Sequence, residues 1–506
     1  MVKTRFQKAK ANMITTLLYQ LVTVVCGILI PKVMIGSFGS QVYGATTSIT
    51  QFLAYITLLE GGIGGVARAE LYRPLSEGNI SQVSKIYNGV CRWFKIIGFL
   101  FLGYTVILAC TYNKIADVDF FAWDYTFWLV VVISISTAAQ YFFGIAKLTL
   151  LNADQKRYIS NLVMIVTTAV NAVLVIVLVK LDCDIMTVKL CSSSIFVLRP
   201  ILFSVYVRKH YAIEKNQQPD KNVLKQKWTG LGQHLAYYLH SNTDIVVLTV
   251  LADVTQVAVY AVYNMVVSSI RNIVTALTGG MEAVFGDMIA KNEKQSLQTS
   301  YKYYEMLISC ATVVLFGTAG ILILPFVKLY TEGVTDAQYI QPAFAFILLM
   351  AEAINCLFLP CSTLPVAANR FRQTKWGAYG EAAINVISSC ILVLWNPLVG
   401  VALGTVLSVL YKNVFYFIYV YRHILQMPVK LGKNYLFNLL LLVAVVAGGY
   451  SLVSCLRIES MLQWAFLGCL VVGAVALVVF AFYGLIYGKQ FVALVKKLLG
   501  KVVKSK

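Results

Sequence analysis

The sequence predicts an all-α protein that crosses a membrane about fourteen times. Two observations carry this prediction. Of the 506 residues, 59% are hydrophobic and only 13% are charged, and apolar runs long enough to span a bilayer recur along the whole chain. A hydrocarbon core of about 30 Å needs roughly 20 apolar residues per helix. The mean hydropathy of +0.75 excludes an ordinary soluble globular protein.

The candidate spans follow one another with short gaps, none of which could hold a separate soluble domain. They lie at about 11–35, 42–66, 92–112, 124–147, 158–180, 185–208, 231–252, 256–280, 302–327, 338–362, 376–396, 399–422, 434–456 and 462–487.

The basic residues that give the chain its net charge of +20 are unevenly distributed along it. Most Lys and Arg residues fall in the N-terminal segment, the C-terminal tail and every second gap, whereas the alternate gaps carry acids such as Asp117, Asp182 and Asp336. Short cytoplasmic loops retain Lys and Arg, so we expect both termini in the cytoplasm and the first span to act as an uncleaved signal anchor. Basic loops favour an anionic membrane surface, and this distribution argues against a nucleic-acid partner.

The polar gap after the sixth span divides the chain into two similar halves. We predict an N-terminal six-helix lobe at 1–208, a cytoplasmic linker at 209–230, a C-terminal six-helix lobe at 231–425, and two extra helices with a basic tail at 426–506. Because six is even, the two lobes have the same orientation, as in parallel repeats. VMIGSFGSQVYGATTSI and VLADVTQVAVYAVYNMV enter the second and eighth spans alike, with Tyr43 matching Tyr260.

Three bases are exceptions to the sorting because they lie inside spans: Arg199, Arg271 and Lys412. A charge at this depth costs a few kcal/mol or more, so it is retained where it has a partner or a task. Guanidinium groups suit phosphate oxygens, and an ammonium acts as a point charge. The three bases are therefore candidates for binding an anionic ligand. The alternative is snorkelling to the interface or structural pairing with buried acids.

Four acids also lie inside spans: Glu60, Asp244, Glu352 and Glu381. Intramembrane carboxylates relay protons or bind a coupling ion such as Na⁺. Their alternative role is to neutralise the three buried bases.

The remaining motifs mainly exclude functions. The eleven Cys residues form no CxxC pair and have no His at ligand spacing, so we predict neither a metal site nor a disulfide framework. The chain has no GxxxxGK[ST] phosphate-binding loop for ATP hydrolysis. We expect no cofactor beyond a coupling ion, Na⁺ or H⁺.

Three segments and the 6+6+2 layout resemble the multidrug/oligosaccharidyl-lipid/polysaccharide (MOP) exporter superfamily, and within it the O-antigen-type polysaccharide flippases. The segments are NTDIVVLTVLADVTQVAVYAVYNMV (242–266), TLLEGGIGGVARAEL (57–71) and the loop and helices at 368–408. Two features depart from the relatives. Glu60-Gly61-Gly62 stands where the superfamily usually has an Asp-x-Gly-like motif, and the first two spans lack the arginines of the lipid-linked peptidoglycan precursor flippases.

The resemblance implies a non-enzymatic flippase with a MATE-like pair of lobes that alternate between inward- and outward-facing states. It would move polyprenyl-pyrophosphate-linked oligosaccharide from the inner to the outer leaflet of the bacterial cytoplasmic membrane, for O-antigen, lipopolysaccharide or capsule biosynthesis. An ion gradient or the membrane potential would drive it, as in an antiporter. Arg199, Arg271 and Lys412 would contact the pyrophosphate.

The expected partners are the lipid-linked oligosaccharide, membrane lipids, a polysaccharide polymerase and glycosyltransferases, and the expected state is a monomer. The alternative within the superfamily is a cation-coupled multidrug exporter, in which Glu60, Glu352 and Glu381 would dominate the cavity. A membrane glycosyltransferase is disfavoured because the outer gaps are short and 117–119 is their one acidic cluster.

Overall fold

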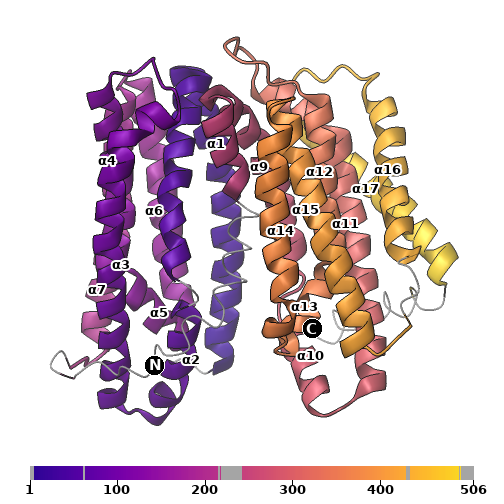
Figure 1. Cartoon of the computed structure of the whole chain (residues 1–506), viewed down its shortest axis with the longest axis horizontal. Coiled ribbons are helices and arrows are strands. Elements are labelled where there is room, and N and C mark those ends of the chain that lie inside the picture. The colour runs from indigo at the N-terminus through magenta and orange to yellow at the C-terminus, as the bar shows by residue number, and fades with distance from the viewer. Residues whose placement is uncertain are drawn as a thin grey trace. The chain divides into compact units, whose positions relative to one another are not determined.

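The computed structural model in Figure 1 describes residues 5–60, 63–214, 217, 242–428, 433–488 and 491. These residues form helices and their connections, and no strand occurs among them. The chain divides into two compact units, which we call unit 1 (1–238 with 248–258) and unit 2 (239–247 with 259–506). The predicted linker lies mostly outside the described residues, so the predicted lobe boundaries stay predictions.

Unit 1 begins with two helical segments that meet at a kink between the first two predicted spans and carry one label, α1. Together they run from Arg5 to Ala54 and are separated at Gly39, whose φ of 81° and ψ of 169° are not helical. A residue without Cβ adopts this conformation at little steric cost. The other elements of unit 1 are η1 (Tyr55–Glu60), α2 (Ile63–Glu77), α3 (Ile80–Ile115), α4 (Trp123–Phe143), α5 (Ile145–Ala153), α6 (Arg157–Lys180) and α7 (Ile185–His210).

In unit 1, α1 packs against α6, and α4 packs against both α3 and α7. Aromatic side chains fill the interior between α3 and α4. Phe101 and Tyr141 pack with ring centroids 5.8 Å apart, and both side chains are buried. Rings of this size contribute much of the buried apolar area of a helical bundle.

An ion-pair cluster outside the spans ties three helix ends of unit 1 together. Asp154, directly after α5, accepts hydrogen bonds from Lys8 Nζ at 3.2 Å and from the Tyr211 hydroxyl at 2.6 Å. Lys156 Nζ lies 2.7 Å from the second carboxylate oxygen. Burial acts to raise the pKa of Asp154, but the bonds from Lys156, Tyr211 and Lys8 outweigh it and hold the pKa below its usual range. The charged carboxylate therefore connects the starts of α1 and α6 with the end of α7.

Unit 2 contains a short apolar helix, Asn242–Leu251, whose last residues belong to unit 1, and ten further elements. These are α9 (Val254–Ala276), α10 (Met281–Ala290), α11 (Lys294–Tyr330), α12 (Pro342–Leu357), α13 (Leu359–Ala367), α14 (Phe371–Leu392), α15 (Pro397–Tyr419), the π-helical turn η2 (Val420–Ile424), α16 (Lys433–Val453) and α17 (Met461–Tyr487). Helix α11 is buried along most of its length and packs against α12, α16 and α17.

Helices α14 and α15 approach closely because glycines lie at their contact. A Cβ on Gly400 would overlap the backbone of Leu392, and one on Gly404 would overlap Ser389. Small residues at helix contacts are typical of membrane bundles, where close backbone approach supplies the packing energy. This contact sets the spacing of the two helices that carry Glu381 and Lys412.

The described helices confirm the predicted all-α membrane fold. Eleven of them are long and apolar enough to cross a membrane. Lys10–Glu60 is one of the eleven and covers two predicted spans. The seventh predicted span is described only over Asn242–Leu251. The eleventh predicted span coincides with α14, which carries several charges and is not one of the eleven. Large apolar side chains such as Leu462 and Leu485 are exposed on the outer helices, as expected for surfaces that face lipid.

Candidate functional site

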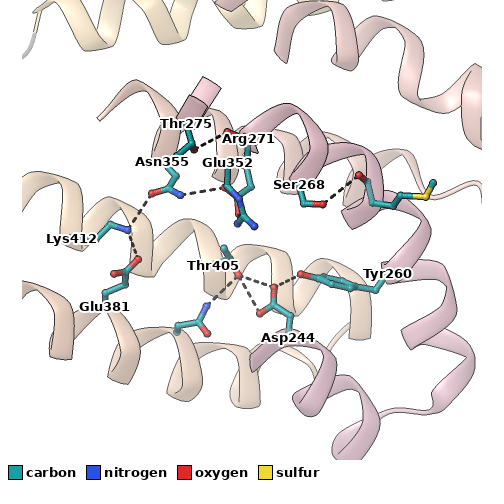
Figure 2. Close-up of polar contacts among 12 residues, drawn as sticks. Asp244, Tyr260, Ser268, Arg271, Thr275, Glu352, Asn355, Glu381, Thr405 and Lys412 are labelled. Atoms are coloured by element: carbon teal, nitrogen blue, oxygen red, sulfur yellow. Dashed lines mark hydrogen bonds and ion pairs between the residues drawn. The ribbon is translucent and has the colours of Figure 1, made fainter. Parts of the chain in front are cut away.

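A chain of alternating charges crosses the interior of unit 2 (Figure 2). Arg271 Nη1 lies 2.9 Å from Glu352 Oε1, and Asn355 Nδ2 donates to Glu352 Oε2 at 3.3 Å. Lys412 Nζ then donates to Asn355 Oδ1 at 3.1 Å and to Glu381 Oε1 at 2.6 Å. We call these five residues the charge network.

Four helices build the charge network, so no two of its charges come from the same helix. Arg271 is on α9, Glu352 and Asn355 are one turn apart on α12, Glu381 is on α14 and Lys412 is on α15. The side chains are mostly buried, with exposed fractions of 8% for Glu352, 12% for Lys412 and 4% for Glu381. Two bases face two acids, which balances the formal charge of the network. The structure thus realises the pairing that the sequence left as an alternative for Arg271 and Lys412.

A second polar cluster lies beside the charge network and contains a carboxylate that has no basic partner in the described ranges (Figure 2). Asp244 Oδ2 accepts from the Tyr260 hydroxyl at 2.9 Å and lies 3.1 Å from Thr405 Oγ1. Asn385 Nδ2 donates to Thr405 Oγ1 at 3.2 Å, while Asn385 Oδ1 is buried without a hydrogen-bond partner in the described chain. We call Asp244, Tyr260, Thr405 and Asn385 the Asp244 cluster. It gathers carboxylate and hydroxyl oxygens at one buried point, and oxygen atoms are the ligands that hard cations use.

Arg199 lies at the middle of α7 in unit 1 and has no acidic partner among the described residues. Its Nε donates to Thr167 Oγ1 and its Nη2 to Thr168 Oγ1, both at 2.8 Å. The guanidinium also lies over the Phe196 ring, 4.2 Å from its centroid. A guanidinium has five N–H donors, so these contacts orient the group and leave donors available. The hydroxyl groups bring no charge to balance it.

Glu60 ends the 3₁₀ turn η1 in unit 1 and is half-buried. The Tyr141 hydroxyl of α4 donates to Glu60 Oε1 at 2.6 Å. Gly61 and Gly62, which follow it, lie outside the described residues. The described contact of Glu60 is therefore with α4, within unit 1.

The seven charged residues predicted from the sequence fall into three settings, and their proposed roles in binding stay predictions. Four of them form the charge network with Asn355, Asp244 anchors its own cluster, and Arg199 and Glu60 lie in unit 1. Sequence reasoning missed the neutral partners Tyr260, Asn355, Asn385 and Thr405. Their signal was present as polar residues within apolar helices, which need partners in a bilayer. Within the described ranges, no group of three or more His, Cys, Asp or Glu residues could hold a metal ion.

Comparison with known proteins gives structural but not sequence matches. No protein-family model and no curated protein matches the chain. The lipid II flippase MurJ in an inward closed conformation is similar at a TM-score of 0.67 and 14% identity, over 94% of this chain and 98% of its own. An inward-facing multidrug resistance MATE family transporter of the MOP superfamily gives 0.61 and 12%, over 80% and 95%. The eukaryotic MATE transporter AtDTX14 gives 0.58 and 11%, over 87% and 99%.

At these identities the likeness establishes the fold. The chain is a multi-pass membrane protein with the fold of MOP-superfamily transporters. This confirms the fold expected from the sequence resemblance. The three similar proteins are transporters or a flippase rather than enzymes, in agreement with the prediction that the chain is not an enzyme.

Proposed function

We propose that the chain is a flippase that moves polyprenyl-pyrophosphate-linked oligosaccharide from the inner to the outer leaflet of a bacterial cytoplasmic membrane. In this proposal both termini are cytoplasmic, the protein acts as a monomer, and the exported glycan feeds surface polysaccharide biosynthesis by a polymerase. The observation that carries it is the uncompensated guanidinium of Arg199, held within the membrane-spanning part of α7.

The contrast between Arg199 and the other two bases supports an anionic headgroup. Arg271 and Lys412 each have a carboxylate within 2.9 Å, so their charge is already balanced. Among the described residues Arg199 has hydroxyl and aromatic contacts but no acidic partner, and a cation without a counter-charge inside a membrane bundle is costly. A pyrophosphate would supply the missing negative charge and accept paired hydrogen bonds from a guanidinium fork. Arg271 and Lys412 would serve the same headgroup only by exchanging a carboxylate partner for a phosphate.

The Asp244 cluster is our proposed coupling site for Na⁺ or H⁺. Asp244 is 4% exposed and interacts with hydroxyl groups rather than a base. A sodium ion would neutralise the carboxylate and take the hydroxyl oxygens of Tyr260 and Thr405 as further ligands, whereas a proton would convert the carboxylate into a donor. Either ion would let a gradient or the membrane potential drive transport without ATP.

A flipping assay in proteoliposomes tests the proposal. A fluorescent polyprenyl-pyrophosphate oligosaccharide placed in one leaflet is chemically quenched from the other side, with and without an imposed Na⁺ or H⁺ gradient. We expect Arg199→Gln to lower the flipping rate roughly 10- to 100-fold, because a hydrogen bond to a charged group contributes about 1.5–3 kcal/mol. Arg199→Lys should retain part of the rate. Arg208→Gln, the same change at an exposed position of α7, is the matched control and should be near wild type.

Asp244 also favours the alternative of a cation-coupled multidrug exporter, because an uncompensated carboxylate could attract a cationic drug. The two functions differ in the substrate that is moved. If the wild-type protein does not flip the lipid-linked oligosaccharide, and cells lose cationic dye efflux with Asp244→Asn, the exporter is correct and the flippase proposal is wrong. A wild-type flipping rate in Arg199→Gln would instead show that Arg199 does not bind the headgroup.

A further inference from the structure

Unit 2 contains a polar cavity that is separate from the charge network and the Asp244 cluster. Its volume is about 540 Å³, and its walls come from α11, the end of α15 with η2, the start of α16 and the end of α17. Lys302, Glu305 and Ser309 line it from α11, and Asn438 and Tyr483 line it from α16 and α17. The predicted transport role uses none of these residues.

Glu305 is the chemically unusual residue of this cavity. Its side chain is buried, with 6% exposed, and no described cation lies within ion-pair distance of it. Within the part of the chain that the structure describes, Oε1 has no hydrogen-bond partner, and neither has the hydroxyl of Ser309 one turn further along α11. Two phenols and the more distant charge of Lys302 act on the carboxylate, but a buried carboxylate oxygen without a donor is unfavourable. The terminal torsion of glutamate is broad, so either oxygen can turn toward a ligand in the cavity.

The walls around Glu305 suit an ammonium group. The phenols of Tyr421 and Tyr435 lie near the carboxylate, and Tyr483 and Tyr487 complete an aromatic lining. Aromatic faces attract cations, and the carboxylate supplies a full negative charge. A primary ammonium would also donate hydrogen bonds to the carboxylate and to the Ser309 hydroxyl.

Two features beside the cavity indicate what is attached to the ammonium. Lys302 and Lys433 line it but are exposed, which places positive charge where a phosphate would lie. Helices α11, α16 and α17 also line an apolar groove of about 450 Å³, with residues such as Ile321, Leu441 and Val475. On α16 and α17 this groove begins within one turn of the polar cavity, and on α11 it begins twelve residues beyond Ser309, at Ile321. The ammonium of such a ligand would thus contact Glu305, and its phosphate would lie near Lys302 and Lys433. Its acyl chain would lie in the apolar groove.

We propose that this cavity binds a phospholipid with a primary-amine headgroup, of the phosphatidylethanolamine class, with its ammonium on Glu305. The ligand would tie the two C-terminal helices α16 and α17 to α11. The proposal does not depend on the transported substrate.

Lipid binding to the purified full-length protein tests the proposal. Native mass spectrometry with added phosphatidylethanolamine, phosphatidylcholine or phosphatidylglycerol gives the apparent affinities for each headgroup. We expect phosphatidylethanolamine to bind about tenfold more tightly than phosphatidylglycerol, and more tightly than phosphatidylcholine, whose quaternary ammonium has no N–H donor. Glu305→Gln keeps the shape of the side chain and should abolish this preference. Glu282→Gln, an exposed acid on α10, is the matched control and should leave the preference intact.

A second variant separates loss of the site from loss of the fold. Lys302→Gln with Lys433→Gln should weaken all three phospholipids while retaining the preference for phosphatidylethanolamine, because it removes the contacts to the shared phosphate only. Equal binding of phosphatidylethanolamine and phosphatidylglycerol by the wild type would overturn the proposal. Wild-type preference in a folded Glu305→Gln variant would overturn it as well.

Discussion

Removing one charge of the Lys412–Glu381 pair should destabilise unit 2 far more than replacing both. The Nζ–Oε1 distance is 2.6 Å, and the side chains are 12% and 4% exposed, so the magnitudes measured for buried pairs apply rather than the 0–1 kcal/mol of surface pairs. Removing one partner of a buried pair costs about 3–5 kcal/mol. Because Asn355 remains as a neutral partner of Lys412, we expect about 3 kcal/mol for Glu381→Gln and a similar cost for Lys412→Met.

The double variant Glu381→Gln/Lys412→Met should cost no more than either single variant, because no uncompensated charge remains. The measurement is a double-mutant cycle on the purified protein in mixed micelles, with helix content followed during reversible denaturation. The exposed Lys291–Asp287 pair on α10, with side chains 60% and 62% exposed, is the control, and its single variants should change the unfolding free energy by under about 1 kcal/mol. Strictly additive costs, near 6 kcal/mol for the double variant, would refute the reasoning that mutual neutralisation keeps these two charges inside the bundle.

Two further variants test the packing of each unit. Asp154→Asn should lower the thermal stability of unit 1 at neutral pH. Because the folded pKa of Asp154 lies below its usual value near 3.9, the difference from wild type should shrink as pH falls from about 4 through the folded pKa, where the wild-type carboxylate also becomes neutral. A difference in melting temperature that stays constant as the pH falls below about 4 would contradict the assignment. Gly400→Ala should cost about 1–3 kcal/mol by unfolding, because its Cβ would overlap the Leu392 backbone,, whereas Gly473→Ala on α17, with open space around the added carbon, should be neutral or stabilising by up to about 1 kcal/mol.

The fold was largely predictable because span length and loop charge are local properties of the sequence. Hydropathy locates helices that must satisfy every backbone group internally, and each predicted span coincides with a helix where the chain is described. The boundaries differ where helices extend beyond the apolar run. Helix α3 begins at Ile80, twelve residues before the predicted span, because its first turns lie outside the apolar segment and begin at the Asn79 cap. The non-helical conformation of Gly39 separates two helical segments and falls in the gap between the first two predicted spans.

The candidate site was predictable as a set of charges but not as a set of contacts. Each charge stands out against an apolar helix, so Arg271, Glu352, Glu381 and Lys412 could be selected one at a time. Their pairing depends on the rotation and depth of four separate helices, which no local pattern encodes. Glu305 was not selected because it lies near the start of its span, where an acid near a basic gap is unremarkable; its burial arises from α16 and α17, which pack against α11.

The pairing of Arg271 and Lys412 with acids means that the number of bases inside the spans does not by itself indicate an anionic ligand. Three bases inside the spans favour an anionic substrate only if their charges are free, and two of them are balanced by Glu352 and Glu381. Among the described residues, the guanidinium of Arg199 in unit 1 has no acidic partner and the carboxylate of Asp244 in unit 2 has no basic partner. A transporter that couples an anionic headgroup to a cation needs one site of each sign. In our proposal each unit supplies one of them, so Arg199 should determine which lipid moves and Asp244 should determine which gradient moves it.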